Sequence, residues 1–522
     1  MHKAVSLLTA QILRKIEFGD YPMSTRQKPD SIWILMSRQW LYVVCFIILL
    51  VARTSAQPTL DSPGELDLIL QGGRVMDPES GLDAVRDIGI RGGRIVEISS
   101  QSMMGRRTVN VSGLVVSPGF IDLHAHGQDL PSSALQVQDG VTTALELEGG
   151  TFPVDDWYKA REGRSRINYG TSVGHGAVRR TVLRGETSQG PAWSYQEATQ
   201  DELETMETMI QRGLEEGALG VGFSIGITPR ASREEILRVF HVGKNNNATT
   251  FAHIRFLGQL EPGSSVEALQ EVIANAAISG SSVHVVHISS MGLNQTPLLL
   301  KMLTDARANG IDISTEIYPY TAASTNLKSP MFDPGWRTSF QADYNDIEWV
   351  ETGERLTEET FESYREQGGM IISHIIPEEI VKTALAHPLV MIASDGSTFI
   401  DGRAHPRGAG TFSRVLGYYV REQQTLTLMD ALRKMTLMPA QRLETIIPQM
   451  QKKGRITIGA DADITIFDPG LIIDRATFAE PARASYGIVH VLVGGEFVVQ
   501  ESQLLEDTRP GKAIRRAVDS ER

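Results

Sequence analysis

The pattern of apolar and polar residues is alike at the two ends of the chain and different in the middle. From Leu66 the sequence alternates apolar and polar residues between glycine turns, as in "LDLILQGGRVMDPESG" and "DAVRDIGIRGGRIVEIS", which predicts β-hairpins. Near the C-terminus, "GRITIGADADITIFDP" and "GIVHVLVGGEFVVQ" repeat this pattern. We therefore predict one small β-sandwich domain built from both termini, with residues 57–116 as its first part and residues 449–522 as its second part and tail.

The middle of the chain, residues 117–448, alternates short apolar runs with amphipathic ones. "SSVEALQEVIANAAISG" has the apolar spacing of a helix, whereas "SSVHVVHISS" contains a short apolar run typical of a buried strand. Repeated over this length, the alternation predicts an α/β fold with a (β/α)8 TIM barrel, whose active site lies at the carboxyl ends of the strands. Residues from about Leu327 to Gly369 interrupt the pattern, and we expect a helical excursion or a lid over the barrel mouth.

A short, fully apolar run from Trp40 to Ala52 precedes both domains. The arginine before this run and the small residues Thr54 and Ala56 after it predict a signal peptide cleaved after Ala56. A membrane-spanning signal anchor is the alternative, but a transmembrane helix needs about 20 apolar residues. Residues 1–56 are thus predicted to be a signal peptide with a possible upstream extension. The mature protein is expected to be exported, secreted or periplasmic, without a stable membrane span.

Composition and charge narrow the class of partner. The 522 residues carry a formal net charge of -13 and are 41% hydrophobic, which is ordinary for a large globular chain. The acidic surplus argues against a nucleic-acid partner, because phosphate binding needs clustered Lys and Arg. Cys45, the only cysteine, lies inside the apolar run, so the mature chain would have neither a disulfide nor a thiolate ligand.

Two histidines follow directly after an apolar run in "LVVSPGFIDLHAHGQD". On a strand, residues i and i+2 point to the same face, so His124 and His126 would aim at one point inside the barrel. Neutral imidazoles bind Zn²⁺ and similar divalent ions. By itself, the pair is equally compatible with two loop histidines.

Three further candidates stand at the ends of other predicted strands. His253 follows the apolar run in "TTFAHIRF", His287 follows the one in "VHVVHISS", and Asp395 follows the one in "LVMIASDGS". Chance placement of four histidines and one aspartate at four strand ends is much less probable than a metal site. His284 would point away from the ligand face, and we expect it to pack in the core or to support a ligand.

Two metal ions would need an anionic bridge, and "TTALELEGG" supplies two glutamates on one face of a strand. An unpaired buried carboxylate is costly, and a metal ion removes that cost. We favour Glu148, at the strand end, as the bridge, with Glu146 as its substitute or as a supporting residue.

These residues and their surrounding motifs resemble the amidohydrolase superfamily and, more narrowly, the D-aminoacylase (N-acyl-D-amino-acid deacylase) family. The resemblance extends over nearly everything after Leu66, in family order. The matching motifs are "GFIDLHAHGQD", "GVTT", "GHGAVR", "GALGVGFSIG", "AHIR", "VVHIS", "YPYTAAST", "ASDGS", "HPRGAGTFSRVLG" and "GADADITIFDP". "YPYTAAST" together with "HPRGAGTFSRVLG" is the most specific part, because the H-x-H motif is shared by the whole superfamily.

The resemblance implies a role for each candidate. His253 and His287 would hold the tighter metal with the bridging residue, while His124 and His126 would line a second, weaker position. Asp395, also close to the metals, would be the catalytic acid and base. Tyr318 and Ser324 match positions that hold the substrate carboxylate, and His175 and Arg179 match a motif at the pocket wall.

The implied activity is metal-dependent hydrolysis of a linear, non-peptide amide, namely the deacylation of N-acyl-D-amino acids. The cofactor would be one or two divalent ions, Zn²⁺ first, and the partner a small N-acyl amino acid. The metal would lower the pKa of bound water towards about 7. Asp395 would then carry the water proton to the leaving amine.

The sequence departs from the family at two positions. Family members typically bridge the metals with a cysteine after "GVTT", where this chain reads "ELEGG", so a glutamate must serve. The family usually has a lysine two residues after the second metal histidine, and Ser289 stands there. Arg255, Arg403 or Arg407 could replace its charge, since a guanidinium suits a carboxylate.

Three rival functions remain open at this point. A hydantoinase-like or dihydroorotase-like enzyme would often bridge its metals with a carboxylated lysine, and no lysine stands at the relevant strand end. A dipeptidase for unusual linkages would share the scaffold. A non-catalytic binding barrel is disfavoured by the complete set of four histidines, a glutamate and an aspartate.

Overall fold

Eight parallel strands form a barrel and confirm the predicted TIM-barrel fold. In the computed structural model, which describes residues 65–517, neighbouring strands pair in the order β6-β7-β8-β11-β12-β13-β14-β18. Their bounds are β6 (Phe120–Asp122), β7 (Val141–Thr151), β8 (Asn168–Gly174), β11 (Gly220–Ser224), β12 (Thr249–His253), β13 (Val283–Val285), β14 (Ile313–Ile317) and β18 (Val390–Ile392). The ring closes just beyond β6 and β18, where Ala125 bridges to Gly396 and the Ser394 backbone N–H donates to Asp122.

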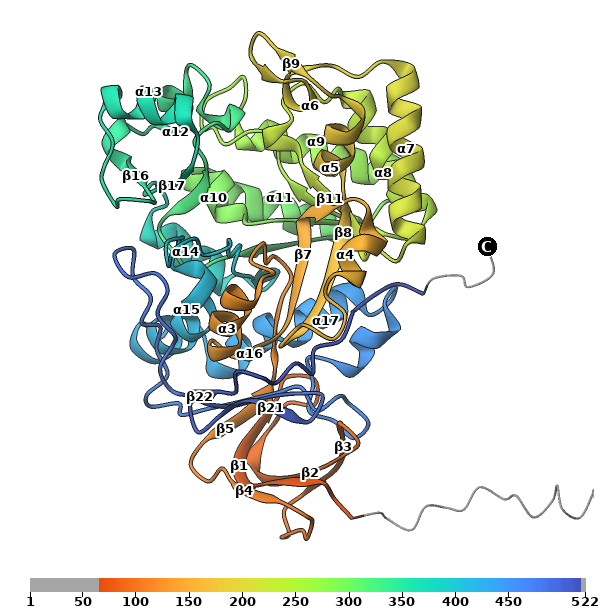
Figure 1. The fold of residues 1–522 in the computed structure, drawn as a ribbon, viewed down its shortest axis with the longest axis vertical. Helices are drawn as coiled ribbons and strands as arrows, with labels where there is room; N and C mark the ends of the chain where they lie inside the picture. The colour runs from red at the N-terminus through yellow and green to blue at the C-terminus, as the bar shows by residue number, and fades with distance from the viewer. Residues whose placement is uncertain (1–64, 518–522) are drawn as a thin grey trace, which may run out of the picture. The chain divides into compact units, whose positions relative to one another are not determined.

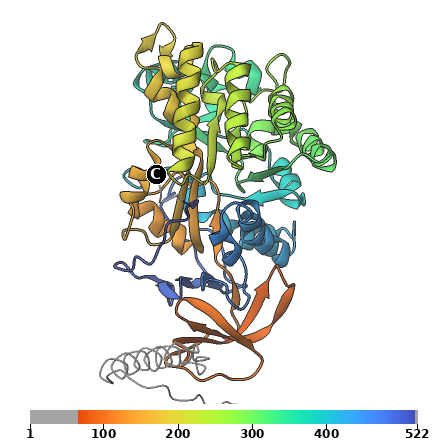
Figure 2. The same cartoon turned by 90° about the vertical axis from the view of Figure 1, so that its right-hand side faces the viewer.

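Helices follow the barrel strands, and most of them cover the outer faces of these strands (Figures 1 and 2). They are α3 (Leu130–Gln138), α4 (Val154–Lys159), α5 (His175–Val182), α6 (Ala192–Tyr195), α7 (Gln200–Glu215), α8 (Arg233–Asn245), α9 (Ser265–Ser279), α10 (Ile288–Gly292), α11 (Thr296–Ala308), α14 (Glu378–Ala386), α15 (Arg407–Arg414), α16 (Leu428–Met435) and α17 (Leu437–Leu443). The sequence encodes some of their starts: α7 begins at a capping box of Thr199 and Glu202, which satisfies N–H groups at the helix end.

Strands from both ends of the chain form one continuous nine-stranded sheet, seen in Figure 1 as red-orange and blue strands side by side. They are β1 (Leu68–Asp77), β2 (Leu82–Arg91), β3 (Arg94–Ser99), β4 (Thr108–Asn110), β5 (Val115–Pro118), β19 (Ile464–Phe467), β20 (Ile488–Val493), β21 (Glu496–Gln500) and β22 (Gln503–Leu504). β5 joins the two halves, because it pairs with β1 on one side and with β19 on the other. The boundaries 57–116, 117–448 and 449–522 stay predictions.

The segment between β14 and β18 carries a small sheet as well as helices. We name residues 323–373 the insert; it contains β15 (Ala323–Asn326), α12 (Trp336–Phe340), β16 (Ile347–Trp349), α13 (Glu358–Gln367) and β17 (Met370–Ser373). The strands pair antiparallel in the order β15-β17-β16. The expectation of a helical excursion from Leu327 to Gly369 is therefore incomplete, because a three-stranded sheet frames the helices.

The tail of the chain returns to the barrel. Ile514 is buried in one apolar cluster with the barrel residues Leu145 and Phe251 and with Leu443 of α17. Its backbone N–H donates to Tyr169 of β8, and its carbonyl accepts from the Tyr158 hydroxyl.

Within residues 65–517, no helix is both long enough and apolar enough to cross a bilayer. The predicted signal peptide and its cleavage site after Ala56 lie outside the described residues.

Candidate metal centre

The predicted donors converge at the carboxyl ends of the barrel strands. His124 and His126 follow β6, Glu148 lies in β7, and His253 ends β12. His287 and Asp395 follow β13 and β18. Donor atoms of two triplets lie within 4.8 Å of one another: His124, His126 and Glu148, and His124, His287 and Asp395.

Two buried carboxylates fix the orientation of the first histidine pair. His124 Nδ1 lies 2.6 Å from Glu316 Oε1, and His126 Nδ1 lies 2.8 Å from Glu146 Oε2. A carboxylate accepts, so each Nδ1 carries the hydrogen and each Nε2 is left to face the centre. The two Nε2 atoms are 3.1 Å apart. Glu146 therefore supports His126, one of the two roles that the sequence left open for it.

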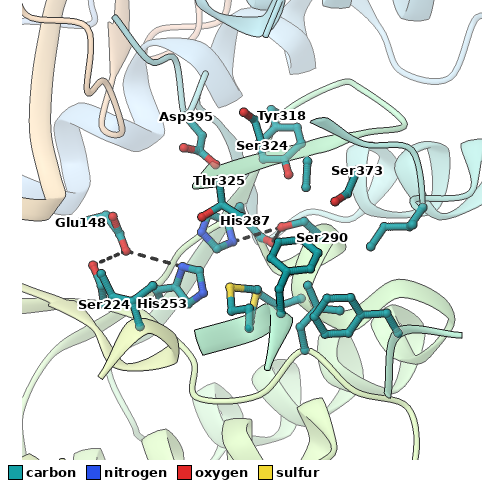
Figure 3. Close-up of a pocket in the computed structure, with 18 of the residues that line it drawn as sticks. Glu148, Ser224, His253, His287, Ser290, Tyr318, Ser324, Thr325, Ser373 and Asp395 are labelled. Atoms are coloured by element: carbon teal, nitrogen blue, oxygen red, sulfur yellow. Dashed lines mark hydrogen bonds and ion pairs between the residues drawn. The ribbon is translucent and has the colours of Figure 1, made fainter. Parts of the chain in front are cut away.

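Glu148 reaches both halves of the site. Its Oε1 accepts from the Ser224 hydroxyl at 2.5 Å and lies 3.5 Å from His253 Nδ1 (Figure 3). Its Oε2 lies 3.6 Å from His126 Nε2. The surrounding histidines hold the pKa of Glu148 well below its usual range, although burial opposes ionisation. One ionised carboxylate thus stands between the two histidine pairs, as a bridging ligand would.

His287 is held in a neutral form suited to ligation. The Ser290 hydroxyl donates to the His287 carbonyl at 2.9 Å, so its oxygen can accept from His287 Nδ1, 3.2 Å away. Nε2 then keeps a free lone pair. Burial and the nearby His253 lower the pKa of His287 to about 3, so the ring is uncharged.

Asp395 lies against both the histidines and an arginine. Its Oδ1 is 3.4 Å from the Nε2 atoms of His124 and His126, and 3.0 Å from Arg407 Nη2. Arg407 and the histidines hold the pKa of Asp395 well below its usual range, although burial opposes ionisation. The carboxylate is therefore ionised.

Two of these residues have a strained backbone. His287 has φ 32° and Asp395 has φ 50°, in the left-handed region that non-glycine residues rarely adopt. Such strain persists only where the surrounding structure over-determines it, and it clusters at functional sites. Here the strained residues lie where the chain turns out of β13 and out of β18 at the barrel mouth.

Sequence reasoning missed Glu316, which lies beneath the site and is 1% exposed. Its Oε2 lies 3.1 Å from His284 Nε2, and His284 Nδ1 is 2.7 Å from the Ser314 hydroxyl. Although burial opposes ionisation, His124 and His284 lower the pKa of Glu316 to about 2. The signal was present: a glutamate within the apolar strand "ISTEI" is as costly unpaired as those of "ALELE".

The predicted substrate-binding residues separate into two groups. Tyr318 and Ser324 line the cavity, and the candidate donors His253 and Asp395 line the same cavity (Figure 3). His175 and Arg179 are fully buried outside the cavity lining and both bind Glu235, at 2.6 and 2.5 Å. The role of His175 and Arg179 in substrate binding stays a prediction. The partner that the structure gives them is Glu235 of α8.

The three arginines considered as substitutes for the missing lysine differ in their hydrogen-bond and ion-pair partners. Arg255 is paired with Glu271 at 2.9 Å, and Arg403 binds the Ala479 carbonyl away from the cavity. Arg407 is 1% exposed and stacks 4.5 Å from the Tyr318 ring centre. Its Nε and Nη1 find no hydrogen-bond partner among the described residues.

The donor set fits divalent metal ions. Donor atoms of His124, His126, His287, Glu148 and Asp395 form two overlapping triplets, and in each of these three histidines Nδ1 has an oxygen partner outside the triplets. His253 offers Nδ1 towards Glu148. Burial alone would lower the pKa of His124, but Asp395 and Glu316 raise it to about 9, which shows how strongly this cluster favours positive charge.

Comparison with known proteins decides the family. The chain matches the amidohydrolase family over residues 107–499. The chain belongs to the amidohydrolase family. The resemblance inferred from its motifs is confirmed.

This amidohydrolase resembles deacylases along nearly its whole length. It is 31% identical to an N-acyl-D-glutamate deacylase of Alcaligenes xylosoxydans xylosoxydans, over 87% of this chain and 97% of the relative. It is 29% identical to the D-aminoacylase of the same organism, over 86% of this chain and 98% of the relative.

Solved structures of deacylases are similar to this chain as well. A D-aminoacylase with a binuclear metal centre superposes with a TM-score of 0.75 and 27% identity, over 86% of this chain and 100% of the other. The N-acyl-D-glutamate deacylase of Bordetella bronchiseptica, complexed with zinc and a phosphonate inhibitor, gives 0.74 and 28% over the same shares. A D-hydantoinase, at 18% identity and a TM-score of 0.58, shares the fold.

Proposed function

We propose that this amidohydrolase uses Zn²⁺ to hydrolyse the amide bond of N-acyl-D-amino acids. The observation that carries the proposal is that His126, His253, His287, Glu148 and Asp395 line one cavity while His124 belongs to both donor triplets beside it, in a chain similar to deacylases over its whole barrel. His253 and His287, with Glu148, would hold one ion. His124 and His126, with Glu148, would hold a second.

The protein's own residues supply orientation and proton transfer. Bound Zn²⁺ would polarise the amide carbonyl and make water acidic. The Asp395 carboxylate accepts the proton of the attacking water and donates it to the leaving amine, which must be protonated to depart. Glu146, Glu316 and Ser290 keep the ring nitrogens aimed during this cycle, since each binds the Nδ1 of one histidine.

The substrate carboxylate would lie against Tyr318 and Ser324, which line the cavity. Arg407 is a buried guanidinium with two N–H-bearing nitrogens unpartnered among the described residues, and an arginine fork suits a carboxylate. Ser289 occupies the position where the family usually has a lysine, and its buried hydroxyl has no hydrogen-bond partner within residues 65–517. Arg407 does not line the cavity and pairs with Asp395, so it would act on the substrate only through Asp395 and Tyr318.

Metal analysis of residues 57–522, with an amine-release assay on paired D and L N-acetyl amino acids, tests the proposal. We expect at least one zinc per chain and turnover of D substrates. In Asp395→Asn we expect turnover to fall by about 10³-fold with metal content nearly unchanged, because the acid and base is lost. His287→Ala should instead lose metal. Turnover confined to L substrates, or an active Asp395→Asn enzyme, would contradict the assignment.

We also propose that the mature chain is exported after cleavage behind Ala56. The support is the apolar run from Trp40 to Ala52 with small residues after it. N-terminal sequencing of the mature protein should begin at Gln57, and a start far from this residue would disprove the cleavage site.

A further inference from the structure

Strand β11 approaches the carboxyl end of β7 closely, although β8 lies between them in the order of the sheet. A β-carbon added to Gly222 would lie 2.5 Å from the Glu148 carbonyl oxygen and 2.6 Å from Ser172 Oγ. Side chains do not approach so closely, so this contact between the strands requires glycine. Ser224, two residues further along β11, shares the face of Gly222 and is thereby brought beside the Glu148 side chain.

The Ser224 hydroxyl contacts one of the two carboxylate oxygens of Glu148. It donates to Oε1 at 2.5 Å, a contact drawn in Figure 3. Ser224 also pairs in register with His253 of β12, whose Nδ1 lies 3.5 Å from the same oxygen. Oε2 faces the other way, 3.6 Å from His126 Nε2 and 3.9 Å from His124 Nε2. Each carboxylate oxygen thus faces one half of the site.

Ser224 is the hydrogen-bond donor to this carboxylate that metal binding would leave in place. A histidine that ligates a metal gives the ion the lone pair of the nitrogen facing it, so that nitrogen cannot donate to Glu148 at the same time. Within residues 65–517, the Ser224 hydroxyl is the one group other than the histidines that donates to the Glu148 carboxylate. The last torsion of a glutamate side chain has a broad distribution of angles. The orientation of the carboxylate therefore depends on Ser224.

A second buried serine holds the backbone beside Glu148 without touching its carboxylate. Ser172 of β8 donates to the Leu147 carbonyl at 2.7 Å and does not line the cavity. Ser224 does line it, together with Glu148 and His253. Ser172 thus supports the strand, whereas Ser224 contacts the carboxylate, and the two hydroxyls form a matched pair for an experiment.

We propose that Ser224 is a positioning residue that keeps Glu148 shared between the two halves of the site, with Oε1 towards His253 and Oε2 towards His126. The inference rests on the proposed function, in which two ions have Glu148 in common, and deepens it. A thiolate bridges through a single atom, whereas a carboxylate can turn both of its oxygens towards one ion. A glutamate in this place therefore needs a group that fixes its rotation.

Zinc binding by Ser224→Ala tests this role. Metal-free protein is titrated with Zn²⁺ in competition with a chelator, and we expect the wild type to bind two ions per chain. In Ser224→Ala the affinity for the more weakly held ion should fall about 10–100-fold, because Oε2 is no longer kept towards His126. The affinity for the tighter ion should change by less than about 3-fold, since the rotated carboxylate still reaches it.

Two further variants separate the hydroxyl from the fold around it. Ser224→Thr keeps a hydroxyl donor and should bind both ions within about 3-fold of the wild-type affinities. Ser172→Ala loses a hydroxyl that contacts only backbone, and should also keep both ions. Unfolding midpoints of the metal-free variants, measured in parallel, report on the fold. A general loosening of the strands would weaken both ions together, so the difference between the two ions is the decisive measurement.

The outcomes distinguish this inference from the proposed function. Unchanged binding in Ser224→Ala, equal loss of both ions, or no recovery in Ser224→Thr would each overturn the positioning role. A wild type that hydrolyses N-acetyl-D-amino acids with a single zinc would overturn it as well, while the deacylase function stands. If the wild type binds two zinc ions and hydrolyses no N-acyl-D-amino acid, the proposed function fails, and selective loss of one ion in Ser224→Ala still supports the role of Ser224.

Discussion

At the scale of single residues, the site depends as much on the groups behind the donors as on the donors. Each Nδ1 of His124, His126 and His287 has its own oxygen partner, and these partners decide which nitrogen faces the centre. Glu316 has the largest role of this kind, because it joins His124 to His284 deep in the barrel. Sequence alone marks Glu316 as a buried carboxylate that needs a partner, but nothing in "ISTEI" indicates which ligand it will meet.

Replacing Glu316 should weaken metal binding without removing a ligand. In Glu316→Gln the amide can no longer accept charge-assisted hydrogen bonds from both histidines, so we expect metal affinity to fall about 10–100-fold. Competition with a chelator on the folded variant measures this directly. Ser314→Ala, which removes only the outermost contact of the network, is the control and should lose much less. Wild-type affinity in Glu316→Gln would refute the positioning role.

At the scale of elements, a buried charge cluster joins two helices of the barrel wall. His175 and Arg179 of α5 bind Glu235 of α8, and Arg179 also donates to the carbonyls of Trp193 and Gln196. Family resemblance placed the α5 pair near substrate, but every nitrogen of the Arg179 guanidinium has an acceptor in the wall. The insert makes the complementary point: its polar, irregular sequence hid a sheet that contributes Ser324, Thr325 and Ser373 to the cavity lining.

Glu235→Gln should destabilise the fold and change its pH dependence. Arg179 would keep its charge in a buried site without a carboxylate, so we expect a loss of about 3–5 kcal/mol at pH 7. His175 and Arg179 lower the pKa of Glu235 to about 2, although burial opposes this, while the unfolded chain has about 4.3. The unfolded state therefore binds the proton first, and wild-type stability falls as pH drops from about 5 to 2.

Urea unfolding midpoints at several pH values measure both effects. The variant should show a lower midpoint at pH 7 and a shallower decline between pH 5 and 2 than the wild type. Metal content of the folded variant should be unchanged, because the cluster touches none of the donors. Unaltered stability together with a raised KM would instead restore a substrate-binding role for Arg179.

At the scale of the whole described molecule, the two ends of the chain are tied to the barrel by different means. The terminal strands share one sheet through β5, whereas the tail inserts Ile514 into the apolar cluster of the barrel. Contacts between residues so distant in sequence make the barrel depend on segments outside it. Truncating the tail is therefore not a neutral way to shorten this protein.

Ile514→Ala tests the tail contact with a single substitution. Removing a side chain that is 1% exposed should leave a cavity and cost about 2–4 kcal/mol. Ile458→Ala, at a position 70% exposed, is the control and should change stability by less than about 0.5 kcal/mol. Denaturant unfolding of the two variants side by side gives the comparison, and equal midpoints would show that the tail contributes nothing.

Sequence by itself determined the barrel, the shared terminal sheet as a β region and the six candidate donors, because periodicity reports burial and parallel strands place their carboxyl ends together. His124, His126, Glu148, His253, His287 and Asp395 could all be named from that rule. Only the tertiary structure decided which groups face each other: Glu146 and Glu316 behind the histidines, Glu235 beside Arg179, and side chains of the insert in the same cavity lining as the donors. These partners lie far apart along the chain, and pairing at that distance depends on packing between elements, which no local pattern encodes.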